Sequence, residues 1–63
     1  MKVFTIDDNM YEVRIDPNRW ATVASTPEGW HIVNQALHVI SSDGALGKSL
    51  IKAVEEYVKE ATS

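Results

Sequence analysis

The chain has no cysteine, which excludes disulfide bonds and thiolate metal sites. It also lacks long apolar runs: nowhere do about 18 apolar residues come together, as a membrane-spanning helix requires. The segment after Met1 does not have the apolar stretch of a secretory signal. We therefore expect a cytoplasmic protein with no membrane partner.

Basic residues are scarce as well. The chain has six Lys and Arg residues against nine Asp and Glu, a formal net charge of −3, and the basic residues are spread along its length. Proteins that bind a phosphate backbone usually carry a basic stripe. Nucleic acid is therefore a possible partner but not a favoured one.

The chain is short, and its 63 residues predict one domain, 1–63. At this size folding buries only roughly 60% of the surface that the unfolded chain exposes, so the core alone gives marginal stability. With no disulfide available, the simplest supplement is a second copy. We therefore expect a homodimer.

The first third has the pattern of an antiparallel sheet. If residues 8–9 form a two-residue turn, Ile6 faces Tyr11 and Phe4 faces Val13, so one face of the hairpin collects the apolar side chains. A third strand is favoured by the aromatic and β-branched residues that follow the turn at Asp16-Pro17-Asn18. These signals predict two or three strands within about residues 2–24.

A helix start signal follows at Ser25-Thr26-Pro27-Glu28, because either hydroxyl can cap a helix and proline is tolerated in its first turn. On a helical wheel the next residues separate into a wide apolar arc and a polar stripe. The arc contains Trp30, Ile32, Val33, Ala36, Leu37, Val39 and Ile40, and the stripe contains His31, Asn34, Gln35, His38 and Ser41. We predict a helix at about 27–41, with strands as the alternative.

The segment 41–44 contains Gly44 and breaks this pattern, and a second amphipathic helix is predicted at about 45–61. Its apolar residues lie on one side, with Lys48, Lys52, Glu55, Glu56 and Lys59 opposite. The predicted fold is therefore α+β: a two- or three-stranded antiparallel meander followed by two amphipathic helices.

No set of residues indicates catalysis. His31 and His38 are seven residues apart, which on a helix separates them by about 10 Å, too far to share a metal ion. We expect no catalytic residues, no metal, no cofactor and no enzymatic activity.

Two tryptophans and the polar stripe are the candidate contacts for an unidentified protein partner. Tryptophan is enriched in binding hot spots, and the width of the apolar arc suggests contact with two neighbours. The candidate partner-binding residues are Trp20, Trp30, His31, Asn34, Gln35 and His38, and Ile32 and Val39 are assigned to a dimer or core surface. The sequence favours a small non-enzymatic interaction or regulatory module.

An alternative comes from residues 19–61, where a strand precedes a helix that begins at a proline, a turn with glycine, and a second helix containing Ala-Val-Glu-Glu-Tyr. This arrangement resembles ribbon-helix-helix repressors. The resemblance implies a dimer formed through the strand, which would insert Arg19, Thr22 or Ser25 into the major groove of DNA.

Overall fold

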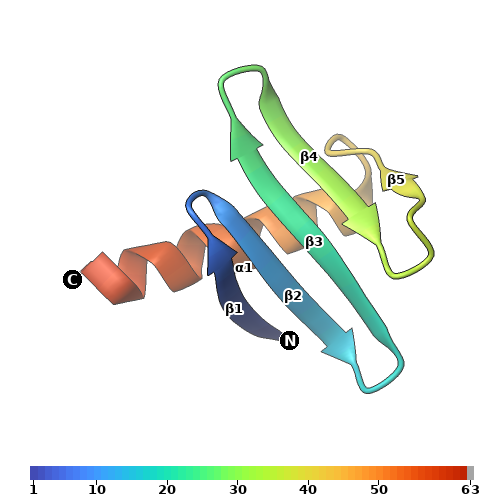
Figure 1. Ribbon diagram of the computed structural model, residues 1–63, viewed down its shortest axis with the longest axis horizontal. Coiled ribbons are helices and arrows are strands. Elements are labelled where there is room, and N and C mark those ends of the chain that lie inside the picture. The colour runs from blue at the N-terminus through green and yellow to red at the C-terminus, as the bar shows by residue number, and fades with distance from the viewer. Residues whose placement is uncertain (63) are drawn as a thin grey trace.

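The computed structural model of the protein describes residues 1–62, which form a five-stranded antiparallel sheet and one helix (Figure 1). The strands follow one another in space as they do in the chain, in the order β1-β2-β3-β4-β5. The bounds are β1 Lys2–Asp7, β2 Met10–Asp16, β3 Arg19–Thr26, β4 Gly29–Asn34, β5 Val39–Ile40 and α1 Ala45–Thr62. No helix in this part of the chain is long and apolar enough to cross a membrane.

The predicted fold is wrong in its middle third. The segment 27–41, predicted as a helix, contains β4, a loop and β5, so the protein has five strands instead of two or three and one helix instead of two. The single helix α1 lies at the position predicted for the second helix. Residues 27–41 would also hold the first helix of a ribbon-helix-helix protein, and without that helix the resemblance no longer supports a function.

The segment Ser25-Thr26-Pro27-Glu28, predicted to begin a helix, lies instead at the hairpin turn between β3 and β4. Thr26 Oγ1 accepts a hydrogen bond from the backbone N–H of Glu28 at 3.3 Å and donates one to the carbonyl of Gly29 at 2.6 Å. Gly29 has a φ of +126°, a conformation that glycine adopts without steric penalty. Thr26-Pro27-Glu28-Gly29 therefore forms the hairpin turn between β3 and β4. The positive φ of Gly29 allows the chain to reverse direction there.

The Asn34 side chain holds the loop that connects β4 to β5. Its Oδ1 accepts hydrogen bonds from the backbone N–H groups of Ala36 and His38, both at 2.9 Å, at the end of β4. Asn34 therefore closes the loop that follows β4, and His38 lies in that loop.

The first hairpin turns where expected but with a register that differs from the predicted one. Asp8-Asn9 is the turn between β1 and β2, with Asn9 at a φ of 58°, which asparagine tolerates. The register shifts between Thr5 and Asp7, so Val3 pairs with Val13 and Phe4 with Glu12, instead of the predicted Phe4 with Val13. One extra residue in a strand moves the preceding side chains to the other face of the sheet.

The turn between β2 and β3 is held by Asp16. Its Oδ1 accepts from the N–H of Asn18 at 2.9 Å, and its Oδ2 accepts from Nε of Arg19 at 2.7 Å. The hydrogen bond from the Arg19 side chain, followed by the one from the Asn18 backbone N–H, lowers the pKa of the Asp16 carboxyl below its ordinary value. The register again shifts by one residue just before this turn, between Arg14 and Asp16.

The core lies between one face of the sheet and α1, which crosses behind the sheet in Figure 1. Its fully buried members come from the three middle strands and the helix: Val13, Ala21, Val23, Ile32, Leu50 and Val54. Val3, Tyr11, Ile15, Trp30, Ile40, Ile51 and Val58 pack around them. The helix supplies the cover for this face, which matches the clean segregation of its apolar side.

The start of α1 approaches the preceding loop closely at Gly47, which is buried. A Cβ added there would lie 2.0 Å from the carbonyl oxygen of Ser41 and 2.9 Å from the Cα of Ser42. Both neighbours are backbone atoms and cannot rotate away. Gly47 therefore sets how closely α1 can approach the chain that links it to β5.

Gly47→Ala is expected to lower the free energy of unfolding by about 2 kcal/mol or more, because the helix must move away from residues 41–42. The gain in helix propensity, about 1 kcal/mol, is smaller. Gly44→Ala is the matched control, since its Cβ would lie 3.6 Å from the Ser41 oxygen, an ordinary contact. Chemical denaturation compares the three proteins, and equal stability of the two variants would contradict this account of the helix start.

Candidate functional site

One face of the sheet has no cover among residues 1–62. Side chains alternate along each strand, and Val13, Ala21, Val23 and Ile32 point toward α1, so their neighbours point away from it. Figure 1 shows this face turned toward the viewer, with the helix behind. We call it the open face; its residues are Lys2, Phe4, Asp7, Met10, Glu12, Arg14, Trp20, Thr22, Ala24, His31, Val33 and Val39.

The strand register arranges most of these side chains in two rows that run across the sheet. The Glu12 row contains Phe4, Glu12, Thr22, Val33 and Val39, one from each strand. The Arg14 row, two residues along each strand, contains Lys2, Arg14 and Trp20. Neighbouring members of a row lie on paired strands, so each row is a continuous strip of side chains.

Apolar groups dominate the open face. Phe4 is 45% exposed, Val39 82% and Met10 37%, while Trp20 and Val33 are half-buried by their neighbours alone. Single exposed apolar residues are common on protein surfaces, but a contiguous group of them marks an interaction site or an aggregation liability. On the open face Val33 and Val39 are direct neighbours with Trp20 on the adjacent strand, while Phe4 and Met10 lie on β1 and β2 beside Glu12.

The charges on this face are few and are already partly paired. Nη2 of Arg14 lies 3.4 Å from Oε2 of Glu12, and the Arg14 guanidinium carbon lies 5.8 Å from the centre of the Phe4 ring. The Glu12 side chain is 27% exposed and that of Arg14 is 54% exposed. Glu12 is the acidic residue in the middle of the open face, while Asp7, which pairs with Met10, lies at its edge beside the β1–β2 turn.

The two predicted tryptophan contacts lie on opposite faces of the sheet. Trp20 belongs to the open face, whereas Trp30 is half-buried and packs against the core on the helix side. Ile32 is 1% exposed and belongs to the core, while Val39 is on the open face. The tryptophans therefore do not form one binding surface.

The predicted polar stripe is not assembled, because its segment is not helical. His31 lies on the open face, opposite Ala24 of β3. The Asn34 side chain is used to close the loop after β4, and Gln35 and His38 are exposed in that loop. The strand and loop conformation separates His31 from the other three.

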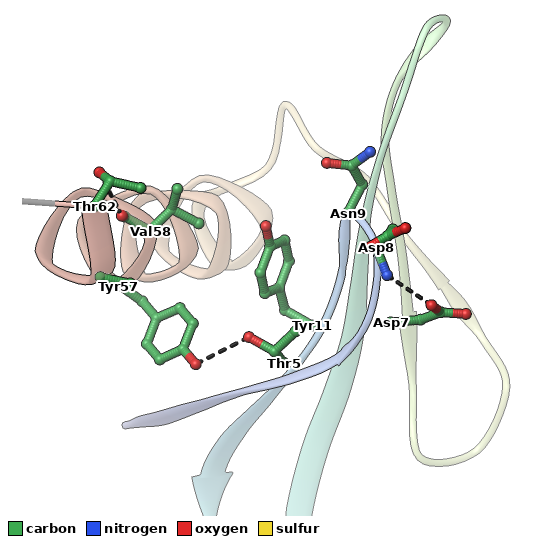
Figure 2. Close-up of a pocket in the computed structure, with 9 residues that line it drawn as sticks. Thr5, Asp7, Asp8, Asn9, Tyr11, Tyr57, Val58 and Thr62 are labelled. Atoms are coloured by element: carbon green, nitrogen blue, oxygen red, sulfur yellow. Dashed lines mark hydrogen bonds between the residues drawn. The ribbon is translucent and has the colours of Figure 1, made fainter.

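A hollow of about 390 Å³ lies on the other side of the sheet, between the end of α1 and the β1–β2 turn (Figure 2). Its aromatic groups contact one another: the rings of Tyr11 and Tyr57 meet edge to face at 6.1 Å, and the hydroxyls of Tyr57 and Thr5 are 2.9 Å apart. These contacts tie α1 to β1 and β2. Within residues 1–62 no three His, Asp or Glu side chains gather as a metal site would require.

Leu37, in the loop before β5, combines two unusual properties. Its φ of 64° lies in the left-handed region, which is unfavourable for a leucine, and 81% of the residue is exposed. The fold gains no burial from this side chain, and asparagine or glycine would fit the backbone better. A strained and exposed apolar residue that the fold does not need is a candidate for contact with a partner.

Leu37→Asn is expected to raise the free energy of unfolding by about 0.5–1 kcal/mol, because asparagine tolerates the left-handed conformation. Leu37→Val is the control, and it should lower stability, because a β-branched residue is more strained at positive φ. Thermal unfolding followed by circular dichroism measures both changes. A loss of stability in Leu37→Asn would show that the leucine side chain supports the fold.

Phe4, Met10, Val33 and Leu37 were not predicted as contact residues. The alternation of Trp30-His31-Ile32-Val33 is typical of a strand and would place Val33 on the face opposite Ile32. The helical pattern over 27–41 includes the same residues and favours a helix. Phe4 lies on the open face because the register shifts between Thr5 and Asp7, and no pattern in the sequence predicts that shift. Compared with known protein families, curated proteins and solved structures, the chain has no match.

Proposed function

We propose that this protein is a small non-enzymatic interaction module that works as a homodimer, and that the open face is where the second copy binds. The observation that carries the proposal is the apolar group of Phe4, Met10, Trp20, Val33 and Val39 on a sheet face that no other element among residues 1–62 covers. The other face of the same sheet already holds the core.

The area of the open face fits a second copy. Residues 1–62 measure 32 × 29 × 21 Å along their principal axes, and the five-stranded sheet forms one broad side. A stable interface buries about 800 Å² on each partner, and two sheets pack face to face about 10 Å apart. In a protein this small the side formed by the sheet is the one broad enough to offer that area, and a second sheet can pack against it.

The size of the core supports the same conclusion. A sheet with one helix buries apolar side chains on one side only, and six residues among 1–62 are fully buried hydrophobics. Burial of Trp20 and its neighbours against a second copy would add about 25 cal/mol for each Å² of apolar surface removed from water. The dimer is then the form in which both sides of the sheet contribute to stability.

Binding of a further, regulated protein remains part of the proposal, with the exposed Leu37 loop as its candidate contact. The polar groups of the open face favour binding over catalysis, since Glu12 and Arg14 pair with each other. Cytoplasmic location stays a prediction from the sequence.

Trp20→Lys is expected to weaken the dimer at least about 30-fold, the effect of losing a hot-spot side chain worth about 2 kcal/mol. In the monomer Trp20 is only half-buried and faces away from the core, so the variant should stay folded. Sedimentation equilibrium over a concentration series measures the dissociation constant, and circular dichroism checks the fold. Lys52→Glu, on the exposed side of α1, is the control. A wild-type protein that stays monomeric throughout the series would refute the proposed homodimer.

A further inference from the structure

The proposed homodimer does not by itself define how the two copies are oriented. The charges of the open face restrict the possible orientations. Two identical copies related by a two-fold axis use the same surface twice, so that surface must be complementary to itself. The open face has two acidic residues: Asp7 lies at its edge beside the β1–β2 turn, whereas Glu12 lies within the sheet, and its carboxylate would be buried between two packed sheets. Within its own chain this carboxylate has one contact of 3.4 Å, to Arg14, and burial is unfavourable for a carboxylate that is not well paired, so a placement that adds a second positive charge is favoured.

Three placements of the two-fold axis can be compared with the two rows. An axis that runs along the Glu12 row places Glu12 against the partner's Glu12, which is repulsive. An axis parallel to the strands, through the central strand β3, places β2 over β4, so Glu12 meets the partner's Val33, which has no charge. An axis perpendicular to the strands and midway between the two rows places Glu12 against the partner's Arg14.

We infer that the second copy binds face to face with its two-fold axis midway between the Glu12 row and the Arg14 row, so that Glu12 and Arg14 form two reciprocal ion pairs across the interface. This inference rests on the proposed homodimer. Within one chain the ion pair is a single contact of 3.4 Å, which leaves the guanidinium free to bind a second carboxylate. Each Glu12 in the dimer then has two guanidinium groups beside it.

The same axis also matches the sizes of the facing side chains. Because it keeps each strand over its own copy, Trp20 of β3 meets the partner's Thr22, a large side chain against a small one. On β1, Phe4 meets the partner's Lys2, whose hydrocarbon stem can cover the ring while its ammonium group reaches water. Large and small residues that alternate between facing rows are what close packing of two sheets requires.

The test uses two charge-reversal variants, alone and mixed. Glu12→Arg gives a face with two positive groups, and Arg14→Glu gives a face with two negative groups, so each variant alone places like charges across the axis. We expect each to weaken its own dimer at least about 30-fold, as loss of a buried charge pair does. An equimolar mixture should form a heterodimer with two restored ion pairs and a dissociation constant within about threefold of the wild-type value, measured by sedimentation equilibrium.

Mixing separates this interface from the ion pair within one chain. Both variants lose the internal pair, and mixing does not restore it, so recovery of the dimer requires contact between chains. The matched control pair is Lys52→Glu and Glu56→Lys, two exposed residues of α1 four positions apart. Neither should change the dissociation constant, alone or mixed.

A second pair of variants covers the case in which a charge reversal does not fold. The chain has no cysteine, so Glu12→Cys and Arg14→Cys each introduce a single thiol. With a short bis-maleimide reagent, the mixture should give several-fold more cross-linked dimer than either variant alone, because only the mixture places thiols on facing positions.

The outcomes distinguish the geometry from the dimer itself. Recovery on mixing, or preferential cross-linking in the mixture, supports the reciprocal pairs. A wild-type dimer that Trp20→Lys disrupts, but that neither mixture restores or cross-links preferentially, refutes this axis and leaves the proposed function standing. A wild-type monomer refutes both.

Discussion

The contact between α1 and the middle of the sheet is the constraint on which the rest of the structure depends. Leu50 and Val54 are fully buried in one cluster with Val13, Val23 and Ile32, and this contact decides which face of the sheet is inside. Because side chains alternate along a strand, it also decides that Trp20 and Val33 point outward. A slip of one residue in a strand would exchange the inward and outward side chains of that strand. The open face is therefore as closely determined as the core.

The parts of the fold that could be predicted from the sequence are those where one pattern has no competitor. In α1 the apolar residues occupy one side and the charged residues the other, and Gly44 marks its start, so its position was predicted to within one residue at its end. The turns at residues 8–9 and 17–18 were also predicted, because Asp, Asn and Pro favour turns through their own hydrogen bonds and backbone restrictions. These signals act over a few residues and need no knowledge of the rest of the chain.

The segment 27–41 and the open face could not be predicted in the same way, because both depend on pairing between strands. Thr26-Pro27-Glu28-Gly29 is compatible with a helix start and with a hairpin turn, and pairing of β4 with β3 selects the turn. The separation of Trp20 from Trp30, and the place of Phe4 beside Glu12, follow from the register. The register in turn depends on one extra residue before each of the first two turns, which composition and periodicity do not mark.

The chain order of the elements has a consequence for folding. Each strand pairs with the one before it, and the turns after β2, β3 and β4 are closed by a side chain at or near the strand end, Asp16, Thr26 or Asn34. Such local pairing favours rapid formation of the meander, hairpin by hairpin. The helix that buries its inner face follows all five strands, so on a ribosome the sheet is made before its cover. During that interval both faces present apolar side chains, and α1 must bind its own sheet before another chain does.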